Sequence, residues 1–176
     1  MQFLSPSDCV AWCSNRGFPT RQVSGETIPG AVHDPDGFHF ARFSHPADSG
    51  RKVWLASYLF SLLKSEREVL VWLGAWSVWP SSQHMPLVTR LRQAFGERRP
   101  LVESPGHLVA SSELDDGVSL LVISLLFVWD CHVIGFSGRD AVHTSHDEYG
   151  WFGSREASVA QDVLRALQDS KVECAA

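Results

Sequence analysis

The 176-residue sequence has no long apolar stretch and no excess of positive charge. Its longest apolar run, residues 118–129, has twelve positions and includes two serines, whereas a helix that crosses a bilayer needs about 18 to 20 apolar residues. The chain starts without a basic segment that leads into an apolar one, which argues against a secretory signal. We therefore expect a cytoplasmic protein that does not enter a membrane.

Cysteines are few, and their spacing indicates reduced thiols. Cys9, Cys13, Cys131 and Cys174 form neither paired CxxC motifs nor a framework typical of extracellular proteins. Catalytic signatures are absent as well, because the sequence has no GxSxG elbow, Walker A loop, GxGxxG after a strand, HExxH pair or EF-hand loop. We predict no bound cofactor.

The composition predicts one globular domain with an uneven distribution of charge. A chain of 176 residues corresponds to about one domain, and 44% apolar with 20% charged residues is ordinary for a globular protein. Residues 1–100 carry eleven Lys and Arg against eight Asp and Glu, whereas residues 101–176 carry four against twelve. The acidic second part favours a basic partner over nucleic acid, although carboxylates also solvate helices and loops.

Helix and strand signals alternate along the chain. Helices are predicted from the cap at Ser5 to Gly17, over residues 52–64, 86–95 and 118–128, and from Ser154 onward, with a strand as the alternative for the second half of 118–128. Strands are predicted over 38–43 and 69–73, a long loop over 19–37, and a hairpin from 129–137 and 140–146. The sequence thus predicts a single α+β domain over residues 1–176. We expect a small, mainly antiparallel sheet with a C-terminal hairpin, covered by helices, and a frayed tail over 168–176.

The predicted hairpin carries most of the polar chemistry. If residues 138–139 form a two-residue turn, His132 lies opposite Ser145 and diagonal to His143, so that the two imidazoles share one face of the sheet. His146 then points to the opposite face, because side chains alternate along a strand.

This pair of histidines suggests a metal site as one hypothesis. His132 and His143 would bind the metal ion together with Asp130, the metal would lower the pKa of a bound water, and Glu148 would act as general base. The result would be a metal-assisted hydrolase; the alternative is a set of hydrogen-bonded surface residues. The letters Ser-His-Asp at 145–147 do not indicate a catalytic triad, because adjacent residues of a strand face opposite ways.

A tryptophan-rich stretch and a small basic cluster support a third hypothesis. Trp72, Trp76 and Trp79 lie in or beside a predicted loop over 74–82, either as a stacking surface or as core residues. The local basic residues are Arg90, Arg92, Arg98 and Arg99. Together they would suit single-stranded nucleic acid, which the overall acidity disfavours.

Several sequence blocks resemble a group of bacterial proteins of similar size that has no assigned activity. The blocks are 76–82 (WSVWPSS), 91–92 (LR), 103–108 (ESPGHL), 126–132 (LFVWDCH) and 145–148 (SHDE). Residues 129–148 are also loosely similar to the end of small cytoplasmic immunity proteins that neutralise bacterial toxins. This resemblance implies a protein partner and supplies no functional residues.

The leading hypothesis is a non-enzymatic bacterial interaction domain, of the immunity or inhibitor type, that presents an acidic surface to a basic protein. It depends on the negative charge after residue 100 and on the absence of a complete catalytic set. The expected contact residues are Asp115, Asp116, Asp147 and Glu148, with Trp79 as an aromatic anchor.

Overall fold

The computed structural model describes residues 1–23, 25–33, 37–76 and 84–174. Its helices are α1 (Pro6–Ser14), α2 (Ser49–Ser61), α3 (Met85–Ala94), α4 (Leu114–Phe127) and α5 (Ala157–Asp169). Its strands are β1 (Gln2–Leu4), β2 (Thr20–Val23), β3 (Glu26–Pro29), β4 (His39–Ser44), β5 (Glu68–Gly74), β6 (Gly106–Ala110), β7 (Asp130–Gly135), β8 (Asp140–Thr144) and β9 (Tyr149–Ser154). The predicted α+β class is confirmed: helices accompany a seven-stranded antiparallel sheet and a separate two-stranded one.

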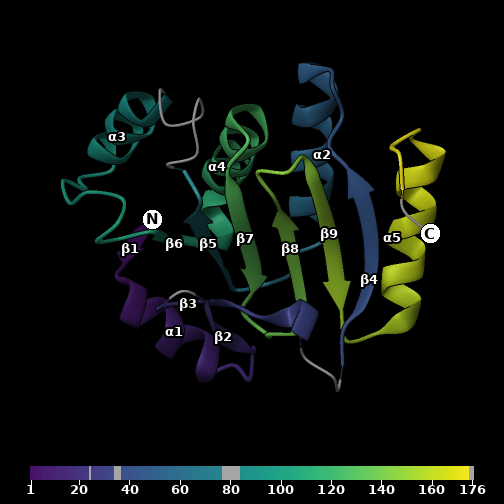
Figure 1. Ribbon diagram of the computed structural model, residues 1–176, viewed down its shortest axis with the longest axis horizontal. Helices are drawn as coiled ribbons and strands as arrows, with labels where there is room; N and C mark the ends of the chain where they lie inside the picture. The colour runs from purple at the N-terminus through teal and green to yellow at the C-terminus, as the bar shows by residue number, and fades with distance from the viewer. Residues whose placement is uncertain (24, 34–36, 77–83, 175–176) are drawn as a thin grey trace.

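A seven-stranded sheet forms the centre of the fold, in the order β1-β6-β5-β7-β8-β9-β4 (Figure 1). Every neighbouring pair is antiparallel. The strands β2 and β3 pair separately as a short hairpin. Among the described residues, no helix is long and apolar enough to cross a membrane.

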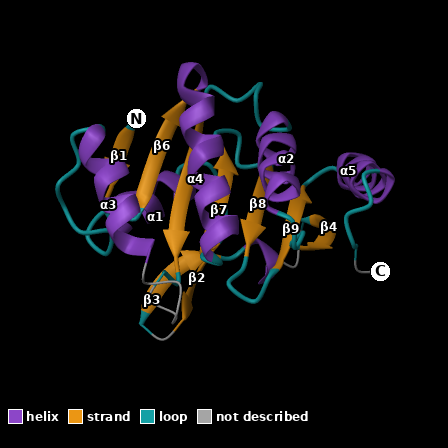
Figure 2. Cartoon of the chain, turned by 90° about the horizontal axis from the view of Figure 1, so that it is seen from above, coloured by secondary structure: helices purple, strands orange, loops and turns teal. Residues whose placement is uncertain are grey.

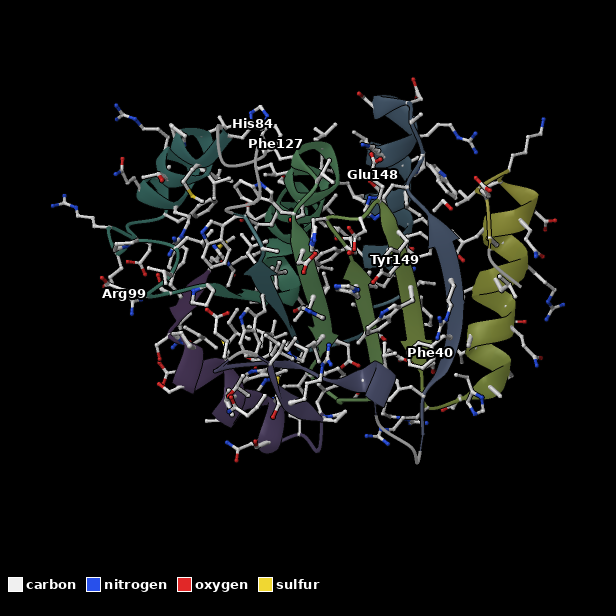
Figure 3. All side chains as sticks on the ribbon, in the orientation of Figure 1. Phe40, His84, Arg99, Phe127, Glu148 and Tyr149 are labelled. Atoms are coloured by element: carbon white, nitrogen blue, oxygen red, sulfur yellow. The ribbon has the colours of Figure 1, made fainter. Side chains whose placement is uncertain are left out.

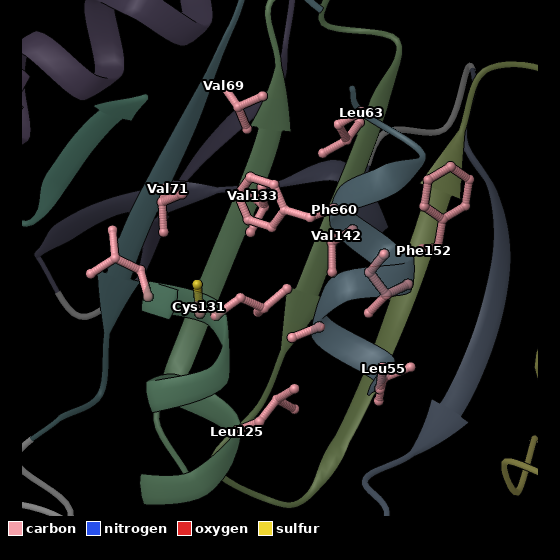
Figure 4. Close-up of a cluster of buried hydrophobic side chains, with 14 of the residues drawn as sticks. Leu55, Phe60, Leu63, Val69, Val71, Leu125, Cys131, Val133, Val142 and Phe152 are labelled. Carbon is pink, nitrogen blue, oxygen red and sulfur yellow. The ribbon is translucent and has the colours of Figure 1, made fainter. Parts of the chain in front are cut away.

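Helices α2 and α4 cover one face of the sheet, and the β2–β3 hairpin lies on the opposite side (Figure 2). Figure 4 shows the main core on the helical side, where Leu55 of α2 and Leu125 of α4 lie over Val133 and Phe152 of the sheet. These four side chains are at most 1% exposed. Burying each of them contributes about 1.5–3 kcal/mol to folding. The apolar run 118–128 therefore forms a buried helix, as predicted.

The other face of the sheet is only partly covered. Helix α1 starts at the predicted cap, where Ser5 Oγ accepts a hydrogen bond from Asp8 N and the Asp8 side chain accepts one from Ser5 N. Cys9, Trp12 and Cys13 of α1 pack over a second, smaller apolar cluster on this face. Beyond this cluster the sheet carries polar side chains.

The sequence missed β9, which contains two glycines and so has little strand propensity. Packing explains its position: a Cβ on Gly150 would lie 2.6 Å from the Phe43 ring, and one on Gly153 would lie 2.9 Å from the Phe40 ring. The rings of β4 therefore occupy the space that side chains would need. Ser154 belongs to this strand and Glu156 is the N-cap of α5, so the predicted cap is two residues early.

The end of the chain is more ordered than predicted. We expected fraying from residue 168, but α5 continues to Asp169. Val172 is 5% exposed, Ser44 N donates a hydrogen bond to Glu173 O at 2.8 Å, and Cys174 pairs with Phe43 of β4. Contacts with the edge strand hold this segment in place.

The predicted loop over 19–37 contains the β2–β3 hairpin, in which four of the eight strand residues are exposed. The hairpin lies on the open side of the sheet, and this position creates the cavity described below.

Candidate functional site

Five side chains form one row across the sheet, from β5 to β4. The strand registers pair Trp72 with His132, His132 with His143, His143 with Trp151 and Trp151 with Arg42. We call these five residues the cross-strand row. Because side chains alternate along each strand, the whole row faces away from α2 and α4.

The row lies where the apolar cover of the sheet ends. Two residues away from the row on β5, β7 and β8, the side chains on the same face are apolar. They are Leu70, Ile134 and Ala141, which belong to the cluster under α1 and are at most 1% exposed. On the other side of the row stands Asp130, which pairs with Gly74. The polar side chains thus lie between a covered apolar surface and the open edge of the sheet.

His132 and His143 stack on each other. Their ring centroids are 4.3 Å apart with planes 24° from parallel, and His143 also contacts the Trp151 ring at 5.5 Å. Burial lowers the pKa of His143 to about 4 and lowers the pKa of His132 well below its usual value. Both imidazoles are therefore neutral at pH 7.

The hairpin is confirmed, but its register differs from the prediction by two residues. Phe136 to Arg139 form a four-residue connection, because Glu66 accepts hydrogen bonds from both the backbone N and the Oγ of Ser137. His132 therefore lies directly opposite His143. A shift of two residues preserves the face of every side chain, which is why the shared face was predicted correctly.

His146 also lines this side of the sheet, against our prediction that it points to the other face. Strand β8 ends at Thr144, so the alternation of side chains no longer applies at His146. Asp130 Oδ1 accepts hydrogen bonds from His146 N at 2.7 Å and from His146 Nδ1 at 2.8 Å. The hydrogen bond between Asp130 and the His146 ring raises the pKa of His146.

A cavity of about 270 Å³ lies over these groups. Its floor includes His132, His143 and Trp151 of the cross-strand row, and its walls include Arg21 and Ile28 of the β2–β3 hairpin. Asp130, Arg42, His146, Asp147 and Tyr149 also line it. We call it the imidazole cavity.

Residues 145–149, which are the turn after β8 and the first residue of β9, lie at one rim of the cavity, and we call this segment the acidic turn. Ser145 N donates to Tyr149 O at 2.8 Å and Glu148 N donates to Ser145 O at 3.1 Å. Glu148 has φ 61°, in the left-handed region that favours glycine. Asp147 is 67% exposed along its side chain and Tyr149 is 48% exposed. Figure 3 shows Glu148 at the end of the sheet away from Phe40, with Tyr149 between them.

The four predicted acidic contact residues do not form one patch. Asp115 and Asp116 lie in the first turn of α4, whereas Asp147 and Glu148 lie beside Asp130, which follows the other end of that helix. From Asp116 to Phe127 the helix rises by about 17 Å, so the first pair lies far from the helix end that precedes Asp130. Trp79 lies outside the described residues.

Two arginines of the predicted basic cluster, Arg92 and Arg99, form contacts within the protein. Arg92 is 3% exposed and donates to Ser104 O at 2.8 Å. Arg99 forms an ion pair with Glu97. Trp72 is 6% exposed. Arg90, Arg98 and Arg99 of the cluster are exposed, whereas Arg92 and Trp72 are buried, so the described arginines and Trp72 do not share one exposed surface.

The predicted metal ligands lie close together without converging on one point. His132 and His143 stack face to face, and Asp130 binds His146 rather than either of them. Within the described residues, no group of three or more His, Cys, Asp and Glu side chains has an arrangement that would hold a metal ion.

Sequence reasoning missed Arg21, Arg42, Trp151 and Tyr149 as cavity residues. They come from β2, β4 and β9, and no local sequence pattern indicates how these strands are arranged around the cavity. Comparison with protein-family models, curated proteins and solved structures gives no match to this chain, so the function must be inferred from the cavity and its rim.

Proposed function

We propose that this chain is a non-enzymatic binding protein that recognises a protein partner through the imidazole cavity and the acidic turn. The observation that carries the proposal is the cavity itself, because it brings polar groups from four separate segments into one concave surface. A concave site with a few convergent polar groups is the usual form of a binding site.

The acidic turn supports recognition of a basic protein surface. Asp147 and Glu148 present two carboxylates next to the exposed ring of Tyr149. Tyrosine at a rim of charged groups is typical of protein interfaces, where the ring contributes contact area and the charges increase the association rate. Asp130 holds the turn in place before a partner arrives, which reduces the entropy lost on binding.

The environment of His146 supports binding rather than catalysis. Its Nδ1 is held by Asp130, as in an acid–base pair, but its Nε2 faces Asp147 Oδ1 at 3.7 Å instead of a nucleophile. A carboxylate in that position would hold the proton on His146 rather than accept one from a substrate.

Affinity capture from the cells that produce the protein tests this proposal. We expect the wild-type chain to recover one partner in stoichiometric amount, with less recovered as the salt concentration rises. The variant D147K/E148K should lose the partner. The control D115K/D116K makes the same charge change in the first turn of α4, away from the cavity, and should keep it. Recovery of the chain alone, or equal recovery of the partner by both variants, would contradict the proposal.

A further inference from the structure

We propose that the imidazole cavity binds an anionic oxygen group, a carboxylate or a phosphate, through the Nε2–H groups of His132 and His143 and the guanidinium groups of Arg21 and Arg42. The inference deepens the proposed function, on which it rests for the location of the site. It follows from the position of the ring protons and from the charges around the cavity.

The surroundings of the two rings determine which nitrogen carries the proton. Nδ1 of His132 and Nδ1 of His143 are both fully covered and have no hydrogen-bond partner among the described residues. A buried N–H without an acceptor is rarer in folded proteins than a buried acceptor without a donor. The neutral rings therefore hold their protons on Nε2 and leave the covered Nδ1 as a lone pair.

The Nε2 atoms then act as donors on the open side of the rings. Both histidines line the cavity, and neither Nε2 is among the covered atoms that lack a partner. Burial and the neighbouring imidazole keep His132 neutral, and burial keeps His143 neutral. Two neutral N–H donors side by side suit a ligand that offers lone pairs.

The arginines supply the positive charge. Arg21 on β2 and Arg42 on β4 line the same cavity, and neither forms an ion pair within the described part of the chain. The charge of Arg21 contributes to the lowered pKa of His132, which places its guanidinium near the ring. A guanidinium group binds carboxylate or phosphate with two parallel hydrogen bonds.

The two carboxylates that line the cavity, Asp130 and Asp147, both face His146. Asp130 accepts two hydrogen bonds from His146, and its charge also acts on His143, where it opposes the effect of burial on the pKa; Asp147 lies on the rim with 67% of its side chain exposed. His146, whose pKa is raised, adds partial positive charge at the same wall. An anion is therefore favoured at the floor of the cavity, between the two histidines and the two arginines.

The same ring orientation disfavours a metal ion as the ligand. A histidine that binds a metal through Nε2 almost always donates its Nδ1–H to an oxygen acceptor. Such an acceptor is missing for both rings in the described residues. The Nδ1 atoms without a hydrogen-bond partner therefore favour an anion over a metal ion as the ligand.

Titration of the purified full-length chain tests this inference, with inorganic phosphate and acetate as probes at constant ionic strength. We expect saturable changes in the imidazole NMR signals of His132 and His143. The variant R21Q/R42Q should weaken binding by at least about tenfold, since it removes both guanidinium groups and their charge-assisted hydrogen bonds. R90Q, which removes an exposed arginine outside the cavity, should leave binding unchanged.

Two outcomes would overturn the inference: no saturable change with either anion, or equal affinity in the wild type and R21Q/R42Q. Tight binding of Zn²⁺ through Nε2 of both histidines would also overturn it. A failed titration leaves the partner-capture result intact, whereas a failed capture with a positive titration contradicts only the proposed function. If phosphate displaces a captured partner, the anion in the cavity belongs to that partner; if it does not, the ligand is a free anion.

Discussion

Asp130 Oδ1 accepts two hydrogen bonds from His146, one from the backbone N at 2.7 Å and one from Nδ1 at 2.8 Å. Because an ionised carboxylate only accepts hydrogen bonds, His146 Nδ1 must carry a proton. One side chain thereby fixes both the backbone of the acidic turn and the orientation of an imidazole on the wall of the cavity.

The first prediction concerns this pair. Asp130→Asn removes the carboxylate charge, and we expect the pKa of His146 to fall back towards its ordinary value of 6.5. Asp147→Asn should lower the pKa less, because that carboxylate is 3.7 Å from Nε2 and mostly exposed. Histidine NMR signals recorded against pH measure both effects, and an unchanged His146 pKa in D130N would refute the assignment.

The second prediction concerns acid stability. Burial lowers the pKa of His45, His107 and His143 to about 4, from 6.5 in the unfolded chain. Between these values the unfolded state binds more protons than the folded state, so stability falls as pH decreases from 6.5 to 4. Each histidine accounts for roughly 3 kcal/mol, a large part of the total for a small domain.

We therefore expect the free energy of unfolding in urea to be highest above pH 6.5 and to drop steeply towards pH 4. His146 acts in the opposite direction, because its raised pKa stabilises the folded state at lower pH. The variant H107F removes one titrating group beside the Phe3 ring and should move acid unfolding to lower pH. A stability that does not change over this range would contradict the burial of neutral imidazoles.

The third prediction concerns the strained residue of the acidic turn. Glu148 has φ 61°, which costs a non-glycine residue about 1–2 kcal/mol. Glu148→Gly should therefore stabilise the fold by about 0.5–1 kcal/mol after the extra flexibility of glycine is subtracted, while it weakens partner capture. Guanidinium unfolding measures the first effect.

Asp147→Gly is the matched control for E148G. Asp147 does not have a positive φ, so glycine there should reduce stability. If E148G destabilises the protein as much as D147G does, the backbone of Glu148 is not strained.

The fourth prediction concerns the connection between β7 and β8. Gly138 has φ 68°, and a Cβ built on it would lie 2.3 Å from Arg16 O. Gly138→Ala should cost about 2–4 kcal/mol from the backbone strain and the clash combined. Gly17 has φ 63° but open space around it, so Gly17→Ala should cost only about 1–2 kcal/mol. Equal costs in chemical denaturation would show that the contact with Arg16 has no effect.

Local signals in the sequence predicted much of the fold. Ser5 and Asp8 determine the start of α1, the buried helix α4 follows from apolar patterning, and the β7–β8 hairpin follows from the turn composition of residues 137–140. His132 and His143 were correctly placed on one face, because the error of two residues in the register keeps the parity of the strand. The error arose from Glu66, a residue distant in sequence that binds Ser137 in the connection.

The remainder of the site depends on tertiary contacts that leave little trace in the sequence. Arg42 joins the cross-strand row only through the pairing of β4 with β9. Strand β9 was not predicted, because its two glycines have little strand propensity. Arg21 lies at the cavity because the β2–β3 hairpin lies over the sheet. The second part of the sequence does carry an excess of acidic residues, but they are not all in one place: Asp115 lies in the first turn of α4, whereas Asp147 lies on the rim of the imidazole cavity.

A hydrogen-exchange footprint of the complex with the captured partner is the most direct test of the central claim, that the imidazole cavity and the acidic turn form the binding surface. We expect the bound partner to slow amide exchange in residues 143–151 and in the β2–β3 hairpin, with no change in the first turn of α4. Slower exchange around Asp115 and Asp116, with residues 143–151 unaffected, would contradict the account.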